Sequence, residues 1–175
     1  MNLLKQFNKD EYKLLKKYVE EVEFNDITNR EGHAAKVYFN SLFGKGFSRS
    51  DDTNINAALD YGYSILLSAI NRHIVSNGYL TQIGIFHDNM FNQFNLSSDL
   101  IEPWRATIDY KAYKNVDKIL DKERKIELIN VINDFVSIDN KLTRINQAIE
   151  IYVRSVFDAL NNSDVSLLKF PSYEL

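Results

Sequence analysis

Four residues carry side chains that could bind a metal ion or transfer a proton: Glu31, His87, Asp99 and Glu102. Two of these carboxylates together with the imidazole would form a mixed oxygen and nitrogen ligand set. Mg²⁺ and Mn²⁺ both accept oxygen ligands and water in octahedral geometry, and the imidazole favours Mn²⁺. Such an ion can polarise a phosphoryl oxygen and lower the pKa of a bound water or of a strand-end hydroxyl. The residues are therefore compatible with metal-dependent phosphate chemistry, which becomes specific only with a wider pattern around them.

Glu31 also has an ordinary structural interpretation. It closes the segment Thr28–Glu31, a capping box in which its carboxylate would accept a hydrogen bond from the Thr28 amide. On a helix it shares a face with Ala35, Tyr38 and Leu42, where a buried carboxylate would need a cation as its partner. Both interpretations, a cap and a buried functional group, stay open.

The other three residues have similar alternatives. His87 lies among apolar residues, so it could be a hydrogen-bonded core histidine and not a ligand. Asp99 and Glu102 are three residues apart, which suits one helix face, but Asp99 could also be a helix cap. Inside a helix the Pro103 ring would clash with the Asp99 carbonyl, so we expect Asp99 to cap and Glu102 to be the freer ligand.

The elements that must position these residues are predicted to be helices. Only two prolines and six glycines interrupt the chain, and apolar residues recur at helical spacing. We expect an all-α, multi-helix bundle forming a single domain over residues 1–175. Helices are predicted from a capping box at Asn8, over 28–43, over 53–76 with Gly78 as the left-handed end, from Ser97–Asp99, over 116–137 and over 141–160, with a loop at 44–52, short helices and turns at 79–95, and a draped or mobile tail.

Composition limits the function classes. The chain has no cysteine, which excludes disulfides and thiolate zinc sites and suits a reducing compartment, so we expect a cytoplasmic protein. Its longest strongly apolar stretch, residues 63–70, is far shorter than the roughly 20 residues that cross a bilayer, so no membrane association is expected. The net charge of −3 means that any site for nucleic acid must be a local basic patch.

Three separate segments together resemble a known family. They are NREGHAAKVYFNSLF at 29–43, GIFHDN at 84–89 and SSDLIEPWR at 97–105. In this order they resemble the CRISPR-associated spacer-acquisition integrases, the Cas-one endonuclease family, and most closely its type II branch. The similarity is dense over residues 28–109, and the helices that follow resemble the rest of that family's helical catalytic domain.

The resemblance implies a divalent-metal-dependent DNA endonuclease and integrase that joins spacer 3′-hydroxyl ends to the repeat array by transesterification. It assigns Glu31, His87 and Glu102 as catalytic metal ligands for Mg²⁺ or Mn²⁺, with Asp99 as a further acidic residue at the metal. It implies DNA and the small second adaptation protein as partners. The family's N-terminal β domain, which supports homodimers, is missing here, so the chain is expected to be either a catalytic fragment or a shortened form.

Three basic residues, Arg105, Lys45 and Arg49, are candidates for contacts to DNA phosphates. Solvated surface residues of the same type are the ordinary alternative. A different function is an interaction module, a bundle that docks other proteins without catalysis. A third, a phosphohydrolase of the HD type, would use His87-Asp88 with His73 and Asp109, whose spacing does not fit well.

Overall fold

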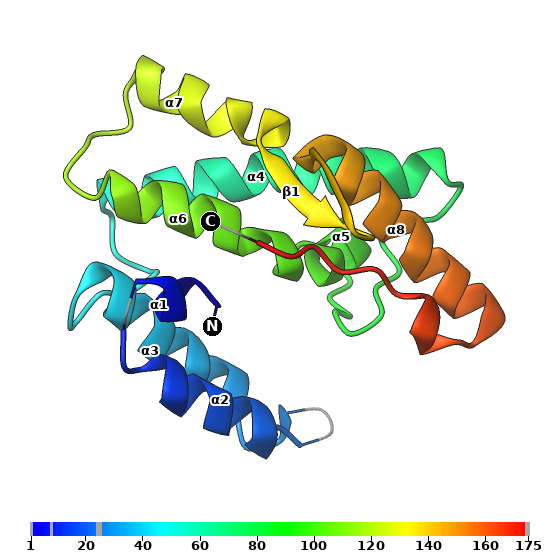
Figure 1. The fold of residues 1–175 in the computed structure, drawn as a ribbon, viewed down its shortest axis with the longest axis horizontal. Helices are drawn as coiled ribbons and strands as arrows, with labels where there is room; N and C mark the ends of the chain where they lie inside the picture. Colours follow the sequence, from blue (N-terminus) through cyan, green and yellow to red (C-terminus); the bar gives the residue numbers. More distant parts are fainter. Residues whose placement is uncertain (1, 8, 24–25, 174–175) are drawn as a thin grey trace.

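The computed structural model describes residues 2–7, 9–23 and 26–173. The fold is mainly helical, which confirms the predicted class, and Figure 1 shows how the elements are arranged. The helices are α1 (Asn2–Gln6), α2 (Tyr12–Glu21), α3 (Arg30–Phe43), α4 (Asn54–Ser76), α5 (Asn95–Leu100), α6 (Arg105–Lys114), α7 (Lys122–Ile129) and α8 (Ile145–Asn162), with 3₁₀ turns η2 (Glu102–Trp104), η3 (Asn130–Asn133) and η4 (Val165–Leu167).

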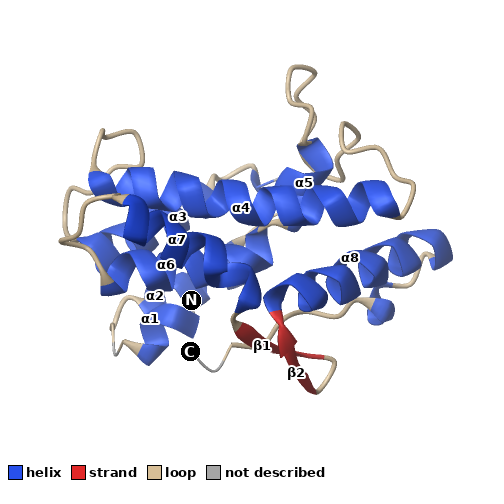
Figure 2. Cartoon of the chain, turned by 90° about the horizontal axis from the view of Figure 1, so that it is seen from above, coloured by secondary structure: helices blue, strands red, loops and turns tan. Residues whose placement is uncertain are grey.

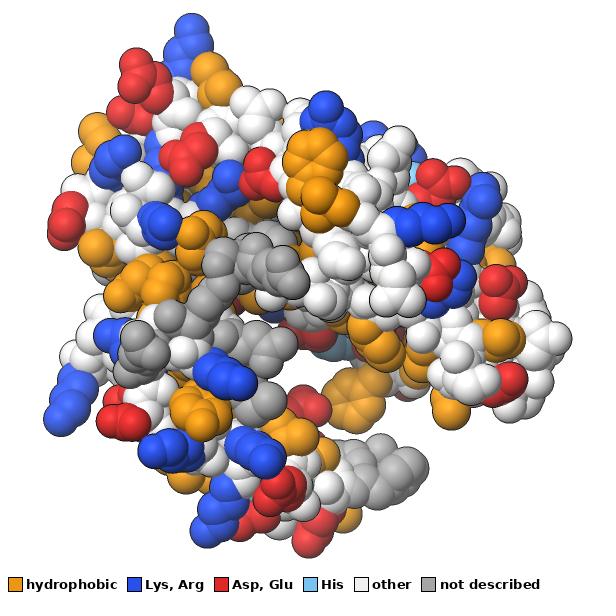
Figure 3. All heavy atoms as spheres, viewed as in Figure 1, with side chains coloured by type: hydrophobic (Ala, Val, Ile, Leu, Met, Phe, Trp, Pro, Cys, Tyr) orange, Lys and Arg blue, Asp and Glu red, His pale blue; other side chains and the backbone are white. Residues whose placement is uncertain are grey.

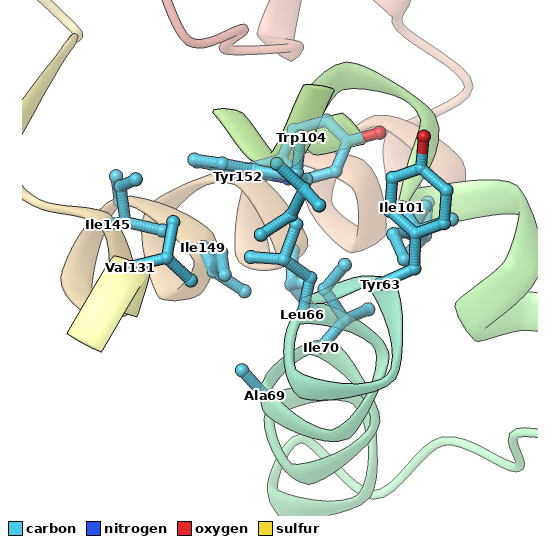
Figure 4. Packing of buried hydrophobic residues seen from close by; sticks show 14 of the residues in the cluster. Tyr63, Leu66, Ala69, Ile70, Ile101, Trp104, Val131, Ile145, Ile149 and Tyr152 are labelled. Atoms are coloured by element: carbon cyan, nitrogen blue, oxygen red, sulfur yellow. The ribbon is translucent and has the colours of Figure 1, made fainter. Parts of the chain in front are cut away.

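The main body, residues 54–173, is built around α4. This long helix packs against α5, α6, α7 and α8, and Figure 2 shows α8 beside it. Leu66 and Ile70 of α4 meet Trp104 and Ile149 in the core (Figure 4), and all four are fully buried. Burying a large apolar side chain contributes about 1.5–3 kcal/mol relative to exposure, so this core holds the helices that position the site.

The N-terminal layer, residues 2–43, has a small core of its own. Leu3, Leu4, Leu15 and Leu42 are buried between α1, α2 and α3. The layer contacts the main body through aromatic residues such as Phe7, whose ring lies 4.3 Å from that of Tyr113 on α6. Figure 1 shows α2 and α3 lying beside the main body at one end of the molecule.

Long helices follow their predicted bounds, but one of their ends uses another residue than expected. At α4 the Thr53 side chain accepts a hydrogen bond from the Asn56 amide, and Gly78 has the predicted left-handed backbone with φ +83°. At α3 the Asp26 carboxylate accepts from the amides of Arg30 and Glu31, so the predicted Thr28–Glu31 box is wrong. A carboxylate with two free oxygens binds both amides, which leaves the Glu31 side chain free.

The first predicted helix also begins later than expected. Asn8 lies outside the described residues, and α2 begins at Tyr12. Glu11, which should have closed that capping box, instead accepts a hydrogen bond from the Ser41 hydroxyl at 3.0 Å. Glu11 thus makes a tertiary contact to α3, while the predicted box at Asn8 lies outside the described residues.

A β-hairpin replaces the end of one predicted helix. Strands β1 (Phe135–Ile138) and β2 (Lys141–Arg144) pair in antiparallel register, so the predicted helix over 116–137 is wrong beyond α7, and α8 begins at Ile145, not at 141. Asp139 and Asn140 both have positive φ, as a type I′ turn requires. Val136 and Ile138 are buried, which attaches the hairpin to the core.

Residues 79–94 form the predicted turns but none of the short helices that were also expected there. Helix α5 begins at Asn95, so Ser97–Asp99 lie inside it and Asp99 is not its cap. The tail is draped, as predicted: Ser172 pairs with Ser137 through two backbone hydrogen bonds, and the Tyr173 hydroxyl donates to the Pro103 carbonyl at 2.7 Å. The last described residues therefore lie across the main body beside η2.

Candidate metal centre

The four candidate residues line one cavity. Glu31 reaches it from α3, His87 from the irregular segment before α5, and Asp99 and Glu102 from α5 and η2. The cavity has a volume of about 670 Å³, and the space-filling view in Figure 3 shows a hollow between the N-terminal layer and the main body with acidic and histidine side chains at its wall. It is also lined by Gly32, Ala35, Ile85, Phe86, Leu100, Tyr152, Val156, Leu168 and Phe170.

His87 is held by Asp99. The Asp99 carboxylate lies 2.5 Å from His87 Nδ1 and accepts hydrogen bonds from the amides of Ile85, Phe86 and His87 at 2.5–3.1 Å. Its side chain is only 8% exposed. Burial raises the pKa of Asp99, but the hydrogen bonds from His87 and these amides outweigh it and hold the pKa below its ordinary value.

The contact determines which imidazole nitrogen can bind a ligand. A neutral imidazole that donates Nδ1–H to a carboxylate has its lone pair on Nε2. Histidines that bind metals commonly donate their other ring nitrogen to a carboxylate, which fixes the tautomer and the ring orientation. His87 therefore presents the nitrogen that a cation would need, while both Asp99 oxygens are engaged with the segment before α5.

Asn95 supports the same segment from the preceding turn of α5. The residue is 3% exposed, and its Nδ2 donates to the carbonyls of Gln82 and Asn89 at 3.0 Å each. Gly84 packs so closely that a Cβ there would lie 2.2 Å from the His87 carbonyl oxygen and 2.8 Å from Asp99 Oδ2. The sequence analysis did not identify Asn95 or Gly84. The spacing of Asn95 and Asp99, four residues apart after an irregular segment, could have indicated that both side chains face that segment.

The two glutamates are less constrained. Glu31 is exposed in the first turn of α3, and Ala35 on the same face is also exposed, so of the two interpretations left open for Glu31 the buried carboxylate is wrong as well. Glu102 accepts a hydrogen bond from Arg105 Nε at 2.9 Å, and 58% of its side chain is exposed. The carboxylates of Asp99 and Glu102 face Tyr152, where burial first and then both charges raise the pKa of the phenol to about 12.

The donor types fit a hard divalent cation, since carboxylates and one imidazole suit Mg²⁺ or Mn²⁺. Within residues 2–7, 9–23 and 26–173, however, no three His, Asp or Glu side chains stand close enough together to hold an ion as placed. The four residues thus share a cavity but not a common point, and their assignment as ligands stays a prediction.

The candidate phosphate-binding residues differ in their surroundings. Arg105 lies over the Tyr63 ring at 4.7 Å besides pairing with Glu102, whereas Lys45 is exposed in the loop after α3. Arg49 donates to Asn56 Oδ1 at 2.6 Å and forms an ion pair with Asp60. Two further cavities, of about 490 and 330 Å³, contain Arg49 and Arg105 and share Ala35 with the candidate centre. Basic side chains therefore line two cavities beside α3, each of which shares a lining residue with the candidate centre.

A buried carboxylate lines the smaller of these two cavities. Asp109 on α6 is 2% exposed and accepts hydrogen bonds from the hydroxyls of Tyr38 on α3, at 2.7 Å, and of Tyr63 on α4. Burial raises the pKa of Asp109 to about 6, against the hydrogen bonds from Tyr63 and Tyr38 and the charges of Arg105 and Arg49, which lower it. Nothing in the sequence alone indicated this cluster.

The arrangement does not favour the HD-type phosphohydrolase. Asp109 is enclosed by the two tyrosines, and His73 lies on α4 facing Asn146 and Glu150 of α8. Neither residue lines the cavity that contains His87.

Comparison with known proteins identifies the family. The family model described as CRISPR associated protein Cas1 matches residues 3–127. The chain belongs to the Cas1 family. It is 34% identical over 164 residues to the CRISPR-associated endonuclease Cas1 of Neisseria meningitidis serogroup C (strain 8013), covering 91% of this chain and 54% of that protein. A Cas1 endonuclease of Francisella tularensis subsp. novicida (strain U112) is 31% identical over 110 residues, covering 58% of this chain and 32% of that protein.

Solved structures share the fold of this Cas1 chain. A casposase bound to integration product superposes with a TM-score of 0.70 at 24% identity, covering 86% of this chain and 54% of that one. A CAS1 protein from Thermotoga maritima gives 0.70 at 18% identity, with 91% and 60% covered. A Cas6-RT-Cas1–Cas2 complex gives 0.74 at 22%, with 98% and 22% covered. The chain spans about half the length of the Neisseria relative and about a third of the length of the Francisella relative. Among the described helices, none has the length and apolar character needed to cross a membrane.

Proposed function

We propose that this chain is the catalytic part of a divalent-metal-dependent DNA endonuclease and integrase of CRISPR adaptation, which joins spacer 3′-hydroxyl ends to repeat DNA by transesterification. The observation that carries the proposal is the cavity itself. It is lined by four residues from three segments of the chain: Glu31, His87, Asp99 and Glu102. Membership of the Cas1 family and the similarity to a Cas1 endonuclease over most of the chain support the same activity.

Glu31, His87 and Glu102 would hold Mg²⁺ or Mn²⁺, with His87 using Nε2. A bound ion supplies Lewis-acid stabilisation of a phosphoryl oxygen and lowers the pKa of a bound water or hydroxyl. Asp99 keeps the imidazole oriented through the 2.5 Å contact to Nδ1. Because its oxygens already accept four contacts, this orienting role competes with the ligand role predicted from the sequence.

The DNA would lie along α3, over the cavities beside the candidate centre. Arg105 and Arg49 line the cavities that adjoin the candidate centre, and Lys45 is exposed nearby, so these three residues could contact phosphates. Partners proposed on family grounds are spacer and repeat DNA, the small second adaptation protein, and a second copy in a homodimer. A structural neighbour contains Cas1 with Cas2, which supports the second of these. A cytoplasmic location follows from these partners.

One observation favours the interaction module as a second candidate function. The segment before α5 exposes a row of large apolar side chains, including Met90 at 87% and Phe91 at 86%. Exposed apolar clusters of this kind are typical of surfaces that contact other macromolecules. An interaction module would bind a partner without metal-induced stabilisation and without cleaving DNA.

Thermal melting with Mn²⁺ and cleavage of branched DNA test the proposal together. Bound Mn²⁺ should stabilise the fold by about 1.4 kcal/mol for each tenfold of free ion above the dissociation constant. Glu31→Gln and His87→Ala should abolish both the stabilisation and the cleavage. Glu20→Gln, which removes an exposed carboxylate of α2 away from the cavity, should change neither. If the two site variants still cleave DNA with Mn²⁺ at the wild-type rate, the catalytic assignment is wrong.

A further inference from the structure

One hydrogen bond connects the two parts of the molecule close to the candidate centre. The Tyr38 hydroxyl on α3 donates to Asp109 Oδ2 on α6 at 2.7 Å. Of the side-chain hydrogen bonds and ion pairs among the described residues, this is the one that joins α1–α3 to the main body. Tyr38 and Asp109 both line the cavity of about 330 Å³ that shares Ala35 and Glu102 with the candidate centre.

The bond lies where it can control the position of Glu31. Seven residues make nearly two full helical turns, so Glu31 and Tyr38 point from the same face of α3. Glu31 faces the cavity, and Tyr38 faces Asp109. Fixing Tyr38 therefore fixes the face and the tilt with which α3 presents Glu31 to His87 and Glu102.

The other contacts between the two parts are packing contacts, mainly of aromatic rings. Phe39 and Phe43 of α3 pack against the main core, and Phe39 lines the cavity next to the candidate centre. Phe7 packs against Tyr110 and Tyr113 towards the carboxyl end of α6, and none of these three rings lines the candidate centre or the cavity next to it. Aromatic packing of this kind holds the layers together but is tolerant of small rotations, whereas a hydrogen bond to a buried carboxylate has a narrow range of geometry. The angle of α3 over the cavity thus depends on Tyr38.

Asp109 is in turn held by the main body. Tyr63 on α4 donates to its other oxygen, and the Tyr63 ring contacts the guanidinium of Arg105, which pairs with Glu102. The cluster therefore links α3 to the same part of the main body that carries Glu102.

We propose that Tyr38 and Asp109 form a positioning pair that sets how closely α3 brings Glu31 to His87 and Glu102, and through this the affinity of the cavity for a divalent ion. The inference rests on the proposed function, because it takes Glu31 as a ligand. Neither residue contacts the ion, so both act through Glu31.

Two hydroxyl deletions on the same carboxylate form a matched pair. Tyr38→Phe removes the hydrogen bond between the two parts, and Tyr63→Phe removes one within the main body. Each keeps its aromatic ring. The chain has no cysteine, so a thiol-reactive spin label attaches only at introduced cysteines. We choose Lys36→Cys on α3 and Asp158→Cys on α8, which are both exposed positions. Double electron–electron resonance without metal then reports the distribution of distances between the two labels. Mn²⁺ titration of the unlabelled variants, followed by electron paramagnetic resonance, reports the dissociation constant.

Tyr38→Phe should broaden the distance distribution and raise the Mn²⁺ dissociation constant at least tenfold. Tyr63→Phe keeps the bond from Tyr38 to Asp109 and the ring that contacts Arg105, so it should raise the dissociation constant no more than threefold and broaden the distribution less than Tyr38→Phe does. In a Glu31→Gln background, Tyr38→Phe should cause no further loss of affinity. Tyr38→p-aminophenylalanine keeps a donor towards Asp109 and should restore both measurements; it also serves as the folded comparison if the phenylalanine variant is unstable.

Equal effects from the two deletions, or an unchanged distribution in Tyr38→Phe, would overturn the positioning pair. The distance measurement needs no ion, so it decides the link between the layers by itself. Wild-type protein that binds no Mn²⁺ would instead refute the proposed function, and with it the metal part of this inference.

Discussion

Replacing Asp99 with asparagine tests the support of His87 directly. The Asp99 carboxylate accepts contacts from three amides and from His87 Nδ1, all in a segment without helix or strand. An asparagine has one acceptor oxygen and one NH₂ donor in the same place. Each Asp99 oxygen accepts two of the four contacts. In Asp99→Asn one of these oxygens becomes an NH₂ group, which cannot accept hydrogen bonds, so two of the four contacts would be lost.

The expected size of the effect follows from those contacts. A hydrogen bond to a charged group contributes about 1.5–3 kcal/mol, so losing two would cost about 3–6 kcal/mol if water could not replace them. Ile85, Phe86 and His87 are exposed, so water compensates part of the loss. We expect a destabilisation of about 2–4 kcal/mol, confined mainly to this segment, and a loss of Mn²⁺ affinity of about 10–100-fold, as is usual when the partner of a metal-binding histidine is removed.

Amide hydrogen exchange and Mn²⁺ titration measure the two effects separately. In Asp99→Asn the amides of residues 85–87 should lose protection while α4 and α8 keep theirs. Asp88→Asn removes the same charge from the neighbouring exposed position and should leave protection and affinity as in the wild type. Unchanged protection at 85–87, or equal losses of affinity in both variants, would refute the reasoning.

Three further predictions concern other positions. Gly84→Ala should displace the segment and weaken Mn²⁺ binding at least tenfold in a titration, because its Cβ would meet the His87 carbonyl oxygen; wild-type affinity would contradict this. Burial raises the pKa of Asp109 from 3.8 to about 6, so folding takes up a proton, and urea unfolding should show stability falling by about 3 kcal/mol as pH rises from about 4 to above 6. Asp109→Asn should lose that decline, and a wild-type slope in the variant would refute it. Asn140→Val should lower the free energy of unfolding by about 1–2 kcal/mol, because φ is +59° there, and an unchanged value would argue against the turn.

The sequence predicted most long helices because their signals are local. Helix α4 was predicted from apolar residues at helical spacing and from Gly78 at its end, and both operate as expected; the structure adds a side-chain cap at Thr53. The hairpin was missed because residues 135–144 are too short for a clear period, although Asp139 and Asn140 between alternating residues are a turn signal.

Capping predictions failed where a polar side chain found a partner away from its own helix end. Asp99 looks like a cap in the sequence, but it lies inside α5 and binds a segment 12 to 14 residues earlier. The site was found only in part for the same reason. Motifs indicated Glu31, His87 and Glu102, which do line one cavity, whereas the Tyr38–Asp109–Tyr63 cluster depends on how three helices converge, and no local pattern encodes that.

Anomalous scattering at the manganese edge, from crystals soaked in Mn²⁺, tests the central claim most directly. Our account predicts one strong peak inside the cavity, within bonding distance of His87 Nε2 and of carboxylate oxygens of Glu31 and Glu102. A cavity without a peak at saturating Mn²⁺, or a peak bound by other side chains while His87 Nε2 stays free, would contradict it.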